Sequence, residues 1–126
     1  MLLFWITVEI SMSSQSNDNG RALEYKIVEC LLNTNLYSSS NETLEDQRRD
    51  IGKYNSLKKE LKNDFDFCAP KIVTWILNKL GSQNNLKIDR LKDADSHVAD
   101  IQFKDLKENI ILNLSIKNNH DDLKHP

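Results

Sequence analysis

The sequence contains few of the residues that mark several specialised protein classes. Its 126 residues include only three Gly and two Pro, which excludes collagen-like and low-complexity chains. Its two cysteines, Cys30 and Cys68, form no Cys-x-x-Cys pair and show no Cys/His spacing typical of metal ligands. Both lie in or beside apolar runs. We therefore expect two reduced, buried thiols in a cytosolic protein.

Neither sign of charge is in large excess. The chain has 17 Lys and Arg against 19 Asp and Glu, which gives a net charge of -2. This balance provides no general attraction to nucleic acid, so any DNA binding must depend on a local cluster of side chains. The length allows one domain at most, which would bury roughly two thirds of its unfolded surface.

The apolar run at the N-terminus, MLLFWITVEI, is too short to span a bilayer. It also lacks the basic start and the small-residue cleavage pattern of a signal peptide, so no membrane segment is expected. The polar sequence after Met12 is typical of the start of a mature cytosolic protein. We therefore expect translation to begin at Met12 instead of Met1, with residues 1–11 as an upstream extension. The alternative is an edge strand or an anchor.

Apolar residues at helical spacing predict a first helix from Asn17 or Asp18 to about Asn33. The apolar stripe of this helix consists of Leu23, Ile27, Cys30 and Leu31, and Glu24 lies at its margin. The SSSNE segment at 38–42 is expected to be a loop.

Two more helices are predicted after this loop. The first begins with Asn41 as N-cap and continues as one amphipathic helix to Phe65, and its charged run from Arg48 to Lys59 is expected to be a solvated face. The other is a short apolar helix with Pro70 in its first turn and Gly81 as its C-terminal cap.

From Leu86 onward the apolar period changes towards two. The segments LKIDRL, HVADIQF and NIILNLSIK, separated by turn residues, therefore predict three short strands. Helices followed by a small, mostly antiparallel sheet indicate an α+β or mixed α/β fold.

Strand alternation divides the last segment into two faces. One face consists of Ile110, Leu112, Leu114 and Ile116, and the other of Ile111, Asn113, Ser115 and Lys117. If residues 104–109 form the hairpin loop, Asp100 lies across from Asn113, with Ser115 and Lys117 further along the same face. An acid and an ammonium group would then lie close together.

Such a pair suits the hydrolysis of a phosphodiester bond. Mg²⁺ binds one or two carboxylates together with water and substrate phosphate, and it stabilises the charge that develops on the phosphate. A lysine can orient the attacking water and offset the same charge. We expect Asp100 to be the metal ligand and Lys117 to be the lysine.

This pattern resembles the PD-(D/E)XK nuclease superfamily. The opening DNGRALEYKIVECLL and the closing LSIKNNHDDLKHP, together with HVADIQF, also resemble the HaeIII family of type II restriction endonucleases. The matching features are a G-R-A-x-E-Y segment before a helix and an S-x-K-x-N-H…K-H segment at the end of the catalytic strand. The resemblance implies cleavage of double-stranded DNA at GGCC, and a cognate cytosine methyltransferase as genetic partner.

By the same resemblance, Asp100, Ser115 and Lys117 are catalytic, and Glu24 supplies a further catalytic and metal-binding carboxylate. Ser115 departs from the superfamily pattern, which usually has an acid at this position. Because a hydroxyl is a poorer metal ligand, Asp100 would have to balance the metal charge together with Glu24, Asp95 or water.

The polar tail after Lys117 is a candidate DNA-binding segment. Its residues are Asn118, Asn119, His120, Lys124 and His125. Such side chains more often hold the phosphate backbone than read base sequence. The histidines could instead pair with Asp121 or Asp122.

A core of this superfamily has a further helix and strand after the lysine strand. We therefore expect residues 12–126 to be the N-terminal part of a single restriction-endonuclease-like domain, truncated after its third strand. That strand would be an edge, and the fragment would be inactive alone. The alternatives are an inactive remnant that binds DNA or a protein weakly, and a different PD-(D/E)XK nuclease.

Overall fold

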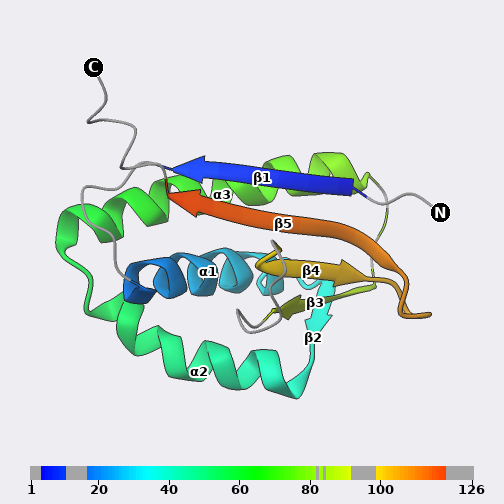
Figure 1. Cartoon of the computed structure of the whole chain (residues 1–126), viewed down its shortest axis with the longest axis horizontal. Helices are drawn as coiled ribbons and strands as arrows, with labels where there is room; N and C mark the ends of the chain where they lie inside the picture. The colour runs from blue at the N-terminus through cyan, green and yellow to red at the C-terminus, as the bar shows by residue number, and fades with distance from the viewer. Residues whose placement is uncertain (1–3, 11–16, 82, 84, 92–98, 119–126) are drawn as a thin grey trace.

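The computed structural model describes residues 4–10, 17–81, 83, 85–91 and 99–118, and Figure 1 shows how they are arranged. These residues form three helices and five strands, so the α+β class expected from the sequence is confirmed. The elements are β1 (Phe4–Ile10), α1 (Asn17–Leu32), β2 (Tyr37–Ser39), α2 (Asn41–Asn55), α3 (Lys59–Leu80), β3 (Leu86–Arg90), β4 (Ile101–Lys104) and β5 (Ile110–Asn118).

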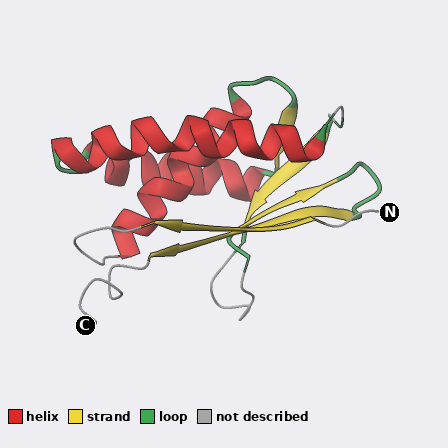
Figure 2. Ribbon diagram, turned by 90° about the horizontal axis from the view of Figure 1, so that it is seen from above, coloured by secondary structure: helices red, strands yellow, loops and turns green. Residues whose placement is uncertain are grey.

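The strands form one mixed sheet in the order β1-β5-β4-β3-β2. β4 runs antiparallel to β3 and β5, whereas β1 pairs with β5 and β2 with β3 in parallel. The sequence thus predicts the antiparallel part and misses both parallel neighbours. Figure 2 shows the three helices on one side of the sheet, so the core forms between them and a single sheet face.

Apolar side chains of β1, β3, β4 and β5 supply the sheet half of this core. Those exposed by 3% or less are Ile6, Leu86, Ile88, Ile101, Phe103, Leu112 and Leu114. They form one cluster with α1 and α3, including Leu23, Ile27, Leu31 and Ile76, which are fully buried. Each buried side chain of this size contributes roughly 1.5–3 kcal/mol, so packing on the helices holds the sheet face in place.

The segment expected to be a loop at 38–42 contains a short strand. Tyr37 and Ser39 of β2 pair in parallel with Leu86 and Ile88 of β3. The N-cap of α2 is Ser40 instead of Asn41, because the Ser40 side chain accepts the N–H of Thr43 at 3.2 Å.

The prediction of one helix from Asn41 to Phe65, followed by a new helix at Pro70, is wrong. α2 ends at Asn55, α3 begins at Lys59, and Pro70 lies inside α3. A proline inside a helix costs about 3 kcal/mol. Buried residues on both sides of it, from Phe65 to Leu80, offset that cost by keeping one apolar stripe on the core.

Gly81 caps α3 as predicted. Its φ angle is 64°, a left-handed conformation that glycine adopts without a steric penalty, and its N–H donates to the carbonyl of Leu77 at 3.0 Å. Among the described residues, no helix is long and apolar enough to cross a membrane.

Residues 4–10 form an edge strand, which was the alternative to the upstream-extension interpretation of residues 1–11. β1 pairs over its whole length with β5, from Phe4 beside Leu112 to Ile10 beside Asn118. β5 therefore has a neighbour on both sides, between β1 and β4, and the expectation that it would be an exposed edge is wrong.

A β-bulge interrupts the predicted alternation of β5. Phe103 pairs with Leu112 but Lys104 pairs with Ile110, so Ile111 is an extra residue in β5. Ile111 is only 5% exposed and belongs to the core, whereas Ile110 is 36% exposed. Ile110 was predicted on the face that Leu112 and Leu114 bury, and Ile111 on the other face, so the prediction is wrong for these two residues. From Leu112 onward the predicted faces are correct.

Candidate functional site

Asp100 lies at a bend immediately before β4, where hydrogen bonds to three described residues, Leu91, Leu114 and Ile116, hold it. Its N–H donates to the carbonyl of Leu114 at 2.8 Å, and its own carbonyl accepts the N–H of Leu91 at 2.9 Å. Its Oδ2 accepts the N–H of Ile116 at 2.7 Å. The carboxylate of Asp100 is thereby fixed beside the triplet Ser115-Ile116-Lys117.

The pairing of β4 with β5 differs from the predicted register by two residues. Gln102 lies across from Asn113, and its Nε2 donates to Asn113 Oδ1 at 2.9 Å, whereas Asp100 was predicted at that position. The cause is the bulge at Ile111 and the tight turn before it, where Asp105 accepts the N–H groups of Lys107 and Asn109. The shift moves Asp100 from Asn113 towards Ser115 and Lys117.

Ser115 and Lys117 lie on the sheet face that points away from the helices. Alternation from Leu112 and Leu114, which are buried in the core, requires this orientation. Ser115 is only 3% exposed, whereas Lys117 is exposed. The ammonium group of Lys117 is therefore accessible to a ligand, whereas the Ser115 side chain is buried.

β1 adds two residues that the sequence interpretation missed. Thr7 pairs with Ser115 and Glu9 pairs with Lys117, and both β1 side chains are exposed. Paired residues on parallel neighbours project to the same face, with the strands about 4.8 Å apart. Glu9 thus brings a second carboxylate to the face of Lys117. The available signal was the alternation of residues 4–10, which fits a half-buried strand.

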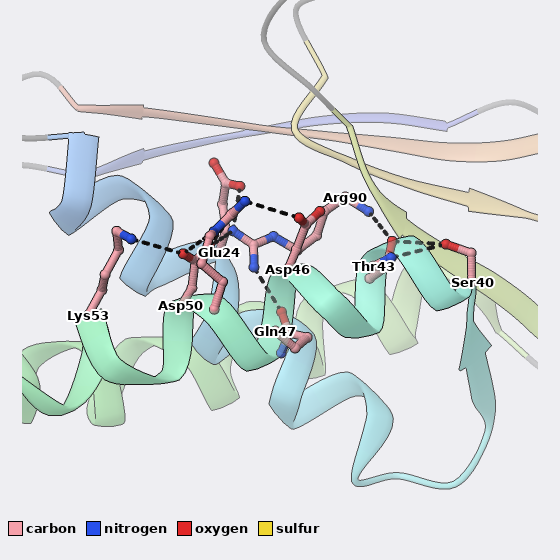
Figure 3. A network of polar contacts seen from close by, with 9 residues as sticks. Glu24, Ser40, Thr43, Asp46, Gln47, Asp50, Lys53 and Arg90 are labelled. Atoms are coloured by element: carbon pink, nitrogen blue, oxygen red, sulfur yellow. Dashed lines mark hydrogen bonds and ion pairs between the residues drawn. The ribbon is translucent and has the colours of Figure 1, made fainter.

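Glu24 lies on the helix side of the sheet, in a buried polar network around Arg90 (Figure 3). Glu24 Oε1 is 3.3 Å from Arg90 Nη2, which also donates to Asp50 Oδ2 at 2.7 Å. The structure therefore does not bring Glu24 together with Lys117, which projects from the opposite face. The metal-binding role that the family resemblance implies for Glu24 stays a prediction.

Asp50 is the buried centre of this network and was expected on a solvated helix face. Its side chain is 0% exposed and is held by Arg90 and by Arg49, whose Nε and Nη2 both lie 2.8 Å from the carboxylate. Burial alone would raise the pKa of Asp50, but the hydrogen bonds from Arg49 and Arg90 outweigh burial and lower this pKa to about 2. Asp50 is therefore ionised and joins α2 to β3.

Six predicted residues of the site lie at the end of the described chain or outside it. Asn118 is the last residue of β5. Asp95, Asn119, His120, Lys124 and His125 are outside the described residues.

Oxygen donors lie on both sides of β5, with Glu9 on β1 and Asp100 immediately before β4. Within the described part of the chain, no group of three or more His, Cys, Asp or Glu side chains could hold a metal ion. Asp100 and Glu9 offer two carboxylates, and Ser115 offers a hydroxyl. Mg²⁺ commonly binds one or two carboxylates and fills its remaining positions with water and phosphate, so this donor set fits Mg²⁺.

Comparison of the chain with protein-family models, with curated proteins and with solved structures found no match in any of the three. Any function assigned to the chain therefore depends on its own residues and geometry, together with the resemblance of its sequence motifs.

Proposed function

We propose that this chain carries the catalytic centre of a type II restriction endonuclease, which cleaves double-stranded DNA by Mg²⁺-assisted hydrolysis. The most direct support is the 2.7 Å hydrogen bond between Asp100 Oδ2 and the N–H of Ile116, because it fixes a carboxylate beside Ser115 and Lys117. The sequence resemblance to the HaeIII family supports the same residues, and it supports GGCC as the recognition sequence.

Asp100 and Glu9 are the residues that would hold the metal. An ionised carboxylate offers about four lone-pair positions, so Asp100 can accept the N–H of Ile116 and still ligate a cation. Glu9 supplies the second negative charge, which the superfamily pattern usually places at the position of Ser115. The hydroxyl of Ser115 is neutral and would at most orient a water molecule beside the carboxylates.

Lys117 acts on the phosphate and on the attacking water. Its ammonium group is exposed and offsets the negative charge that increases on the phosphate oxygens during the reaction. A bound Mg²⁺ would supply Lewis-acid stabilisation of the same charge. Asn118 and the tail residues Asn119, His120, Lys124 and His125 hold the DNA backbone in this proposal.

The expectation that the chain is inactive alone depended on β5 being an exposed edge. Because β5 lies between β1 and β4, we now propose that the chain itself cleaves DNA, and a cleavage assay tests this. Two duplexes that differ only in having GGCC or a scrambled GCGC are incubated with the protein in Mg²⁺ or in EDTA. We expect cleavage of the GGCC duplex in Mg²⁺ alone and a loss of about 100-fold or more in Lys117→Ala, because charge stabilisation and water activation each contribute factors of this size. Lys107→Ala, which removes an exposed lysine in the β4–β5 turn, is the matched control and should cleave normally.

The absence of an acid at position 115 favours a second candidate, a chain that binds DNA without cutting it. Binding of the duplex without cleavage in Mg²⁺ supports that candidate and contradicts the enzyme. Equal cleavage of both duplexes contradicts the restriction specificity and supports a different PD-(D/E)XK nuclease.

A further inference from the structure

The outer face of α3 exposes aromatic rings and lysines in strict alternation. Phe67, Lys71, Trp75 and Lys79 are spaced four residues apart and are all exposed. Phe67 is 69% exposed and Trp75 is 44% exposed, an unusual placement for large rings on a helix whose opposite side is buried. We refer to these four residues as the α3 stripe.

Each lysine of the α3 stripe lies over the ring that precedes it. Lys71 Nζ is 4.6 Å from the centroid of the Phe67 ring, and Lys79 Nζ is 6.0 Å from the centroid of the Trp75 ring. Four helical residues rise about 6 Å, so rings and ammonium groups alternate along about 18 Å of the helix.

Within the α3 stripe the charge has one sign, and the nearest acids along α3, Asp64 and Asp66, precede Phe67. Residues 67–80 contain two lysines and no Asp or Glu, although the whole chain has 19 acidic residues. A partner with complementary charge is therefore an anion. It must also carry apolar groups that can contact the separate rings of Phe67 and Trp75.

We propose that the α3 stripe binds a single strand of nucleic acid, with bases stacked on Trp75 and Phe67 and phosphates at Lys71 and Lys79. A nucleic acid strand alternates flat rings with negative charges, which complements the alternating rings and positive charges of the α3 stripe. The stripe turns by about 120° around the helix axis over its length, so the strand would follow a gently winding path. A lipid surface instead requires rings and lysines at different depths, because the apolar groups enter the bilayer and the charges stay outside. Base stacking on an aromatic side chain is also stronger than an exposed cation–π contact, so a base can displace the lysine from the ring face.

This surface is separate from the candidate catalytic centre. α3 belongs to the helix layer, which covers one side of the sheet (Figure 2). Ser115 and Lys117 project from the other face, because they alternate with the buried Leu112 and Leu114. Binding at the α3 stripe therefore requires neither Mg²⁺ nor Lys117, and it can be tested independently of the proposed nuclease activity.

The test uses the fluorescence of Trp75. The chain has two tryptophans, so the variant Trp5→Phe leaves Trp75 as the only one. This variant is titrated in EDTA with an oligothymidylate, and the anisotropy of a labelled oligothymidylate gives the affinity. We expect quenching of Trp75, and affinity about sevenfold weaker when salt rises from about 50 to about 200 mM, as two phosphate contacts to a single strand predict.

Variants separate stacking from charge. Trp75→Ala should bind about tenfold more weakly, whereas Trp75→Phe should retain most of the affinity. The double variant Lys71→Gln/Lys79→Gln should bind the oligothymidylate more weakly, and its affinity should depend less on salt. The control double variant Lys58→Gln/Lys59→Gln, at the start of α3, should keep the wild-type affinity and salt dependence. An oligomer of abasic sites has the same phosphates without bases and should leave Trp75 unquenched.

Several results would overturn the proposal. They are an unquenched Trp75 at saturating oligothymidylate, equal binding of the abasic oligomer, and unchanged affinity in the Lys71 and Lys79 double variant with its helix content intact. Binding of anionic phospholipid vesicles or of polyglutamate in place of the oligothymidylate would also overturn it and would assign the α3 stripe to a membrane or to an acidic protein.

Discussion

The carboxylate of Asp100 accepts the backbone N–H of Ile116 at 2.7 Å. This hydrogen bond joins the bend before β4 to the strand that carries Ser115 and Lys117. It fixes a charged group at a position that side-chain packing alone would leave free to rotate. The same bond therefore has a structural effect and a functional effect, and two variants of Asp100 separate them.

Removal of the acceptor should destabilise the fold. We expect Asp100→Ala to lower the free energy of unfolding by about 1–3 kcal/mol, because the N–H of Ile116 loses its partner. Asp100→Asn keeps an oxygen that can accept this N–H, so it should lose less than half as much. Urea denaturation followed by circular dichroism measures both values. Equal losses in the two variants would show that charge, and not the hydrogen bond, stabilises this bend.

Glu9 should contribute to metal affinity without contributing to stability. Its side chain is exposed and pairs in register with Lys117, so Glu9→Gln should weaken the binding of Mn²⁺, used as a probe for Mg²⁺, while leaving the urea midpoint unchanged. Titration calorimetry measures the affinity, and Glu42→Gln, an exposed acid in the first turn of α2, is the control. Equal Mn²⁺ affinities in the wild-type and Glu9→Gln proteins would remove Glu9 from the metal site.

The polar network around Arg90 should be essential for stability. Arg90→Ala leaves the fully buried Asp50 with one arginine fewer, and breaking a buried ion pair in this way typically costs 3–5 kcal/mol. Arg48→Ala removes an exposed arginine that pairs with Glu45, and we expect a cost below about 1 kcal/mol. Urea denaturation of the two variants compares these losses, and a similar cost for both would mean that the Arg90 network contributes little.

Acid should remove the stabilisation that Asp50 provides. The pKa of Asp50 falls from an ordinary 3.8 to about 2 in the folded chain. Its contribution is therefore complete above about pH 4 and is lost as the pH falls through 2, a change of about 2 kcal/mol. The difference in unfolding free energy between the wild-type protein and Asp50→Asn should narrow by this amount between pH 5 and about pH 2. A difference that stays constant over this range would contradict the lowered pKa.

Local sequence signals predicted much of the scaffold. The helical spacing of Leu23, Ile27 and Leu31 predicted α1, because these side chains make one stripe that must be buried. Gly81 predicted the end of α3, because few other residues adopt a positive φ angle without strain. After Leu86 every second residue is apolar, and this alternation predicted β3, β4 and β5 because a strand buries one of its two faces.

Features that depend on distant residues were missed. Neither Gly nor Pro marks the break between α2 and α3, and Pro70 suggested a helix start where burial of Phe65 and Ala69 keeps the helix continuous. The bulge at Ile111 and the pairing of β1 with β5 depend on partners far along the chain. As a result, the sequence named Asp100, Ser115 and Lys117 but gave the wrong register for Asp100 and omitted Glu9.

The rate at which Asp100→Asn cleaves a GGCC duplex in Mg²⁺ tests the proposed catalytic centre most directly, because this variant removes the negative charge and keeps an acceptor for the N–H of Ile116. The rate is measured with enzyme in excess, so that all DNA is bound. We expect a fall of about 100-fold or more relative to the wild-type protein, with similar DNA affinity and similar stability. A wild-type protein that binds the duplex but does not cut it, or an Asp100→Asn protein that cuts at the wild-type rate, would contradict the assignment.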